Sequence, residues 1–344
     1  MYGIEIVIPV SFKGPYGQRL LDFKKFGLLN VQDKKVLLTL LVGTEKIEKA
    51  KNGWPENVSI NIISNDNCHE VTKIYGYLSS LKDATKSRWL AKFDDDSIND
   101  VSALVDKLDK EFDYTRDYYV ITEFRNERWP EEENILRKLG YGRWCAKDYN
   151  LWHELEGSVI SQAALVKILE NEIAVKFLTM RAKIANGYTD CALAHAARIV
   201  KIFPSDAYFM SKEPFIGELS IFGGSLAHIH NISHDKNDYT IDLLDRMLRK
   251  DMSGSSKLYP EIVNKDFVYR NWQGLHEIHL NENGIIEGVC DAKIWHMKQD
   301  HLEFLRNDGQ LIAAFDNYEN TNFLKGYSLY PHAKGFKPTL RKLA

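Results

Sequence analysis

Residues 89–97 constrain the fold most, because an apolar run there, Trp-Leu-Ala-Lys-Phe, ends in three consecutive carboxylates and a serine. A buried strand tolerates no unpaired charge, so the acidic residues must lie where the strand leaves the core. Ligands of open α/β sheets bind outside the carboxyl ends of the strands, and a cation there relieves the repulsion between like charges. Carboxylate oxygens suit Mg²⁺ or Mn²⁺, which bridge to substrate phosphates. The stretch therefore predicts a divalent-cation site.

The same residues have a purely structural alternative. Asp-rich turns are common after strands, and Asp96 or Ser97 can cap a helix that begins near Ile98. Composition alone does not separate a cation site from a capped turn.

Apolar runs alternate with amphipathic segments through the first half of the chain. The patterns predict strands at residues 4–10, 36–42, 58–64, 89–94 and 118–122, and helices at 19–29, 47–51, 68–81 and 101–112. This alternation predicts an α/β fold with a parallel, nucleotide-binding sheet. No Gly-x-Gly-x-x-Gly follows the first strand and no Walker sequence is present, which disfavours dinucleotide oxidoreductases and P-loop ATPases.

The Lys-Phe-Asp-Asp-Asp sequence of residues 92–96 resembles the DxD motif of GT-A glycosyltransferases, particularly the fringe-like and related β-1,3-glycosyltransferases. The resemblance implies a GT-A fold, with a Rossmann-like, mostly parallel sheet, over residues 1–250. It also implies a bound Mn²⁺ or Mg²⁺ and a nucleotide-sugar donor. Asp94 and Asp95 would contact the nucleotide sugar, and Asp94 and Asp96 the metal.

The exit of the first strand lies at the sheet edge where a nucleotide would bind. Pro9 ends that strand, Ser11 begins its exit loop, and Arg19 opens the following helix. We expect these three residues to contribute to nucleotide binding.

Two further stretches resemble the fringe-like group. Residues 152–161 and the Ser-Gln-Ala-Ala sequence of residues 161–164 resemble its donor–acceptor strand and helix start, where Gly157 permits close backbone approach. The second stretch is residues 187–194. The resemblance implies that Asp190 in this stretch is the catalytic base, although Asp190 can also cap the next helix. Glu156 is the next candidate for the base.

Two histidines at residues 228 and 230 alternate, so both face one side of a predicted strand. In the resembled family, a histidine after the base-bearing helix often completes the metal site. The spacing does not distinguish His230 from His228, and isolated histidines are often structural.

Near residues 251–257 the pattern changes to short strands separated by turns. We expect residues 256–344 to form a small antiparallel β domain. The run from Trp295 to Phe315 resembles accessory modules of bacterial polysaccharide and lipooligosaccharide glycosyltransferases. This resemblance implies no catalytic residue.

Composition limits the partners. A net charge of −3 does not indicate nucleic-acid binding, which usually requires an excess of basic residues. The four widely spaced cysteines are expected to be reduced residues of the core. No apolar run reaches the ~18 residues of a membrane helix, and the N-terminus does not resemble a signal peptide. We expect a soluble cytoplasmic protein of bacterial or viral type, with peripheral contact at the inner membrane face as the alternative.

The sequence therefore predicts a metal-dependent, inverting glycosyltransferase. It would move a sugar from a nucleoside-diphosphate sugar, with UDP the expected nucleotide, to a saccharide acceptor in surface polysaccharide or glycoconjugate synthesis. A nucleotidyltransferase would also place acids after a strand to hold Mg²⁺. A non-catalytic carbohydrate-binding protein is the third alternative, favoured by aromatic residues between positions 125 and 144 and by the C-terminal β region.

Overall fold

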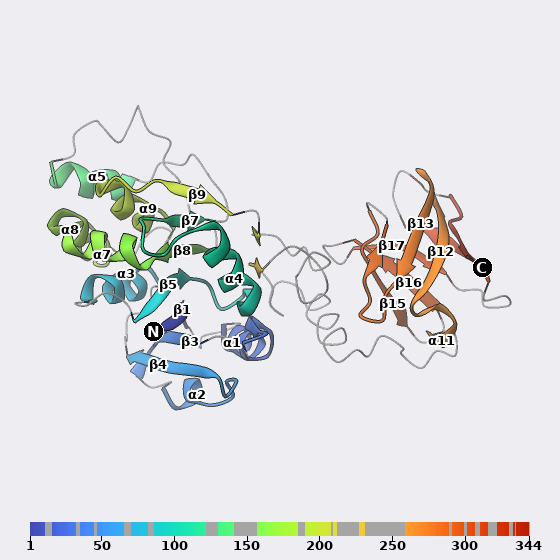
Figure 1. Ribbon diagram of the computed structural model, residues 1–344, viewed down its shortest axis with the longest axis horizontal. Helices are drawn as coiled ribbons and strands as arrows, with labels where there is room; N and C mark the ends of the chain where they lie inside the picture. The colour runs from blue at the N-terminus through green and yellow to red at the C-terminus, as the bar shows by residue number, and fades with distance from the viewer. Residues whose placement is uncertain are drawn as a thin grey trace. The chain divides into compact units, whose positions relative to one another are not determined.

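The computed structural model (Figure 1) describes most of the chain in two compact units. The described residues of the first unit are 1–10, 16–31, 35–44, 47–64, 70–81, 86–121, 130–140, 157–184, 190–207, 209–211 and 227–230. Those of the second unit are 259–288, 291–298, 301–306, 310–315, 322–329, 333 and 335–343. The expected boundary near residues 250–256 lies outside these ranges.

A seven-stranded sheet forms the centre of the first unit, in the order β4-β3-β1-β5-β8-β7-β9. Its strands are β1 (Tyr2–Pro9), β3 (Val36–Val42), β4 (Val58–Ser64), β5 (Ser87–Lys92), β7 (Tyr119–Ile121), β8 (Ser158–Ser161) and β9 (Pro204–Asp206). Every neighbouring pair is parallel except the two that involve β8, which runs antiparallel to β5 and β7. The predicted mostly parallel α/β architecture is confirmed.

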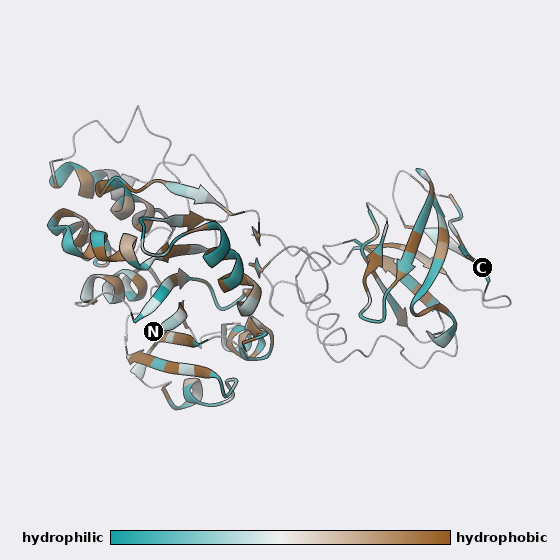
Figure 2. Ribbon diagram, in the orientation of Figure 1, coloured by the Kyte–Doolittle hydropathy of each residue, from teal (hydrophilic) through white to brown (hydrophobic). Residues whose placement is uncertain are grey.

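Helices cover both faces of this sheet (Figure 1). One face packs against α3 (Glu70–Ser80), α5 (Pro130–Lys138), α7 (Gln162–Glu170), α8 (Glu172–Arg181) and α9 (Asp190–Ile199). The other face packs against α1 (Tyr16–Asp22), the π-helical turn η1 (Phe23–Gly27) and α4 (Val101–Glu111). The short helix α2 (Ile47–Lys51) follows β3. In Figure 2, brown segments appear in β4, β7 and β8, whereas β9 is pale.

Strand alternation divides the core between the two faces. In β1, Ile4, Ile6 and Ile8 belong to the α4 side and Val7 to the α3 side. Continuous apolar runs are therefore required of these central strands, because neither face meets water.

A second, smaller sheet joins distant segments beside the end of β5. Its order is β10 (Met210–Ser211), β11 (His228–Ile229), β6 (Ile98–Asp100) and β2 (Leu28–Leu29). β11 pairs antiparallel with β6, so His228 lies opposite Asn99. This pairing brings residues 228–230 to the acidic turn that precedes β6.

The second unit is an antiparallel sheet, as predicted. Its order is β14 (Ile286–Glu287), β13 (Gly274–Leu280), β12 (Lys265–Asn271), β19 (Thr339–Lys342), β18 (Phe323–Ser328), β17 (Leu311–Phe315), β16 (His301–Leu305) and β15 (Ile294–Lys298), preceded by α11 (Tyr259–Ile262). A bridge between Ile285 and Ile294 links the two ends, so the sheet is nearly closed. Edge-on contacts between Tyr269, Phe304 and Phe315 fill its interior.

Candidate metal and nucleotide site

The three carboxylates follow β5 in a tight turn. Phe93 N donates to Val7 O at 3.2 Å, which extends the β1–β5 pairing to the start of the turn. Ser97 closes the turn by donating from both its Oγ and its N to Asp94 O, at 2.9 and 3.3 Å. Helix α4 begins only at Val101, and its N-cap is Asp100, whose side chain accepts from Ala103 N. The capping role considered for Asp96 and Ser97 therefore belongs to Asp100.

The turn lies where the strand order of the sheet reverses. From β1 the chain proceeds outward to β3 and β4 on one side, whereas β5 lies on the other side of β1. Open α/β sheets bind their ligands at this position, outside the carboxyl ends of the strands. Pro9 ends β1 at this edge and is buried.

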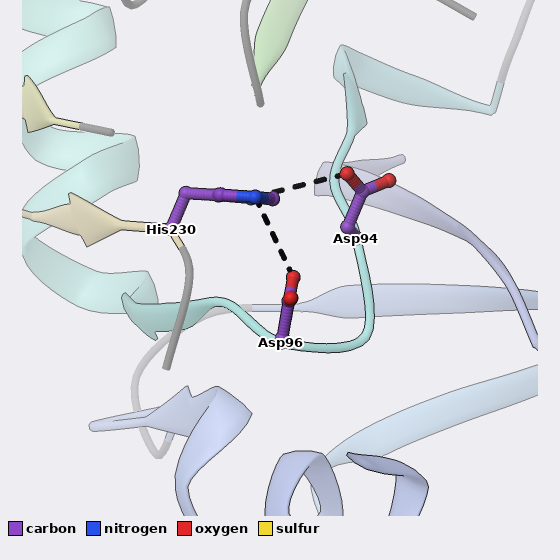
Figure 3. A group of neighbouring side chains, drawn as sticks. All are labelled: Asp94, Asp96 and His230. Carbon is purple, nitrogen blue, oxygen red and sulfur yellow. Dashed lines mark ion pairs between the residues drawn. The ribbon is translucent and has the colours of Figure 1, made fainter. Parts of the chain in front are cut away.

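His230 reaches the turn from the end of β11 (Figure 3). Its Nε2 lies 3.6 Å from Asp96 Oδ1, and its Nδ1 lies 3.9 Å from Asp94 Oδ2. One ligand atom from each of the three residues lies within 4.8 Å of the others, a spacing that can hold a metal ion. The Asp96 side chain is 1% exposed and that of Asp94 25%, so Asp94 is the more accessible to a ligand.

Two cationic side chains face the same carboxylates. Arg19 Nη1 lies 3.1 Å from Asp96 Oδ2 and 3.9 Å from Asp95 Oδ1. Lys92 Nζ, which is almost fully buried, lies 3.5 Å from Asp94 Oδ1. Asp94 and Asp96 thus each turn one oxygen toward a cation and the other toward His230. The cations reduce the repulsion between the clustered carboxylates.

His228 lies apart from this group. Its Nδ1 is 2.7 Å from Asn99 Oδ1, and its ring stacks on Phe93 with centroids 4.1 Å apart. Asn99 Nδ2 in turn donates to Gly27 O at 2.7 Å and to Ser97 Oγ at 3.2 Å. His228 therefore contacts side chains on both sides of the acidic turn.

Gly157 is the residue against which His228 packs. A Cβ atom at Gly157 would lie 2.7 Å from His228 Nε2 and 3.3 Å from the Phe93 ring. Only glycine allows this approach without a shift of the ring. Gly157 thus lets the backbone pack against His228. Its approach to a donor or acceptor, which the resemblance implies, stays a prediction.

The structure describes the other predicted site residues only in part or not at all. Asp190 is the first residue of α9, and the structure does not describe its side chain. Ser11 and Glu156 lie outside the described residues. The segment between residues 125 and 144, whose aromatic residues favour carbohydrate binding, contains α5, and the rest of it is largely outside the described ranges.

Sequence reasoning missed three residues of the site. Lys92 lies within an apolar run, and its position shortly before the acidic turn is a visible signal in the sequence. Lys73 donates from Nζ to Val10 O at 2.9 Å, which places a buried cation at the end of β1. Asn99 gave no signal, because its partner is 129 positions away.

Comparison with known proteins gives limited similarity. No protein-family model matches the sequence, and no curated protein matches it. A crystal structure of the galactosyltransferase LgtC with donor and acceptor sugar analogs aligns at 11% identity and a TM-score of 0.40, covering 75% of this chain and 99% of that one. TarS of S. aureus aligns at 11% identity and a TM-score of 0.36, covering 71% of this chain and 39% of that one. The function therefore rests on the geometry of the site.

Among the described residues, no helix is a candidate for spanning a membrane. No helix there combines the length and the apolar character that crossing a bilayer needs.

Proposed function

We propose that the chain is a metal-dependent glycosyltransferase of the GT-A type, using a nucleoside-diphosphate sugar. The observation that carries the proposal is the convergence of Asp94, Asp96 and His230 within 4.8 Å at the strand-order reversal between β1 and β5. This position suits a nucleotide, and the convergent ligands suit a cation beside its phosphates.

The residues present fit a divalent cation. Two carboxylates and one imidazole form a donor set suited to Mn²⁺, and Mg²⁺ is the alternative with carboxylate and water ligands. The carboxylates belong to a short turn held by Ser97 and Asn99, so their positions are restricted before any ligand arrives. A cation bound there would neutralise charge on the departing nucleoside diphosphate.

Arg19 is placed to contact the phosphates of the donor. Its guanidinium pairs with Asp96 at 3.1 Å. A guanidinium group can form two parallel hydrogen bonds to a phosphate as it does to a carboxylate. Arg19 can therefore exchange Asp96 for a phosphate oxygen. Pro9, Ser11 and Asp95 complete the proposed nucleotide side of the site.

Asp190 is the proposed general base. A carboxylate at the start of α9 would accept the proton of the acceptor hydroxyl as this hydroxyl attacks the anomeric carbon. A single displacement of this kind inverts the anomeric configuration. Glu156, on the approach to β8, is the alternative base, and a saccharide the proposed acceptor.

The proposal is tested by supplying nucleotide sugars with Mn²⁺ and identifying the products. A UDP-sugar is the first donor to test, since the resembled family most often uses UDP. We expect metal-dependent release of nucleoside diphosphate and free sugar in the absence of acceptor. Release of pyrophosphate from a nucleoside triphosphate and a sugar phosphate would instead establish a nucleotidyltransferase, and binding without turnover would leave a carbohydrate-binding protein.

A further inference from the structure

The C-terminal end of the chain has a charge bias that the proposed reaction does not use. Residues 320–344 contain five Lys or Arg and no Asp or Glu, whereas the whole chain has a net charge of −3. Such a local excess of one sign creates a positive potential over the surface that carries it.

Strand alternation places part of this charge on the outer side of the sheet. In β18, Leu324 is fully buried while its neighbours Phe323 and Lys325 are exposed. Tyr327 follows with the same period and is 43% exposed. The outer side of β18 therefore presents a ring, a cation and a second ring in succession.

The neighbouring strands add two more cations to this side. Arg341 of β19 lies opposite Phe323, and Thr339 of β19 lies between Lys325 of β18 and Arg270 of β12. Both arginines are exposed. We call this surface the basic–aromatic face, made of Arg270, Phe323, Lys325, Tyr327, Thr339 and Arg341.

Rings and cations on this face are close to one another. Lys325 Nζ lies 5.9 Å from the centroid of the Phe323 ring. The Arg270 guanidinium lies 5.9 Å from the centroid of the Phe336 ring, on the segment that leads into β19. The acidic side chain of Asp266, near the opposite end of β12, is paired with His279 at 2.8 Å.

We propose that the basic–aromatic face binds an acidic polysaccharide. Aromatic rings pack against the apolar faces of sugars, while lysine and arginine pair with carboxylates. The Thr339 hydroxyl can exchange hydrogen bonds with sugar hydroxyls. Alternation of these groups along rigid strands matches a chain that presents sugar faces and negative charges in turn.

A lipid surface fits the same groups less well. Membrane-bound elements separate an apolar side that enters the bilayer from a charged side that remains in water. On β18, in contrast, Phe323, Lys325 and Tyr327 project from the same side of one strand. The face therefore has no separate apolar surface to insert.

The experiment measures binding of the full-length protein to polygalacturonate, an acidic polysaccharide, by calorimetry at low and moderate salt. Neutral dextran, polyphosphate and vesicles containing phosphatidylglycerol are the comparison ligands. We expect polygalacturonate to bind at least ten-fold more tightly than each of the others, because it alone combines sugar rings with charge.

Variants then locate the site. Lys325→Gln with Arg341→Gln should weaken polygalacturonate binding at least ten-fold, and Phe323→Ser with Tyr327→Ser should do the same without changing the charge. Lys265→Gln with Arg306→Gln removes two exposed cations of the same unit outside the face and should change affinity less than two-fold.

Three results would overturn the proposal. They are equal binding of polyphosphate or vesicles, equal binding of dextran, and equal losses in the face and control variants. Because the wild-type comparison needs no substitution, it decides the proposal even where a variant fails to fold. Binding is measured without donor or metal, so its outcome is independent of the proposed transfer reaction.

Discussion

Asp96 divides its carboxylate between two partners, with Oδ1 3.6 Å from His230 Nε2 and Oδ2 3.1 Å from Arg19 Nη1. The arrangement gives one oxygen to the proposed metal site and the other to a cation that can instead bind phosphate. Because Asp96 is almost completely buried, these two partners stand in for the water that would otherwise solvate its oxygens.

Gly157→Ala should disturb the acidic turn through His228. The new Cβ would lie 2.7 Å from His228 Nε2, so the stacked ring or the strand must move, at a cost of about 1–3 kcal/mol. Gly3→Ala is the matched control, because its Cβ would meet no atom closer than 3.4 Å. Thermal unfolding of both variants measures the difference.

A double-mutant cycle identifies His228 as the cause. Adding His228→Ala removes the ring that the new methyl group contacts, so the double variant should be more stable than the sum of the two single losses predicts. Strict additivity would mean that the cost of Gly157→Ala arises elsewhere.

Asp190→Asn separates catalysis from helix capping. Asparagine caps a helix about as well as aspartate, so the melting temperature and the affinity for the nucleotide sugar should remain. An amide cannot accept the proton, and loss of a general base costs roughly 10²–10⁴ in rate. Turnover is measured with donor and acceptor. If Asp190→Asn retains it while Glu156→Gln loses it, Glu156 is the base.

His195 makes the first unit sensitive to acid. Burial in α9, together with the neighbouring Arg198 guanidinium, lowers the pKa of His195 from 6.5 to about 3. Between these values the unfolded chain binds a proton that the folded chain does not. Stability therefore rises with pH in this window and is lost as pH falls below 6.5, by up to ~1.4 kcal/mol per pH unit.

The variant His195→Gln checks this assignment. Its melting temperature should fall less between pH 7.5 and 5.5 than that of the wild type, because glutamine does not titrate. A variant as sensitive to this pH change as the wild type would attribute the loss to other groups.

Truncation after Ser253 tests whether the C-terminal β region is a separate module, with residues 1–250 and 256–344 as the proposed domains. We expect the shortened chain to keep metal-dependent donor hydrolysis and to transfer less sugar to its native acceptor. Insolubility, or loss of donor hydrolysis as well, would make the region part of the catalytic core.

Local pattern predicted the regular elements well. The strands at residues 36–42 and 58–64 have the predicted bounds, because each is a short apolar or β-branched run between turns. The antiparallel direction of β8 was not predictable, because an apolar run does not indicate whether a strand pairs parallel or antiparallel with its neighbours. The predicted helix at 19–29 was wrong beyond Gly27, where Leu28 pairs with Asn99 in the second sheet.

The site was predictable in part. The acidic turn was visible because three charges follow an apolar run, and His230 because two histidines alternate. The different surroundings of His228 and His230 depend on the pairing of β11 with β6, which joins residues 129 positions apart. No local pattern encodes such a pairing.

The most direct test of the metal site is calorimetric titration of Mn²⁺ and a nucleoside diphosphate into wild type, Asp96→Asn and the control Asp117→Asn. Asp117 is a surface carboxylate paired with Lys167, so its replacement changes charge equally without touching the site. We predict that Asp96→Asn alone loses Mn²⁺-dependent binding of the nucleotide while remaining folded. Equal Mn²⁺-dependent nucleotide binding by Asp96→Asn and wild type would contradict the assignment.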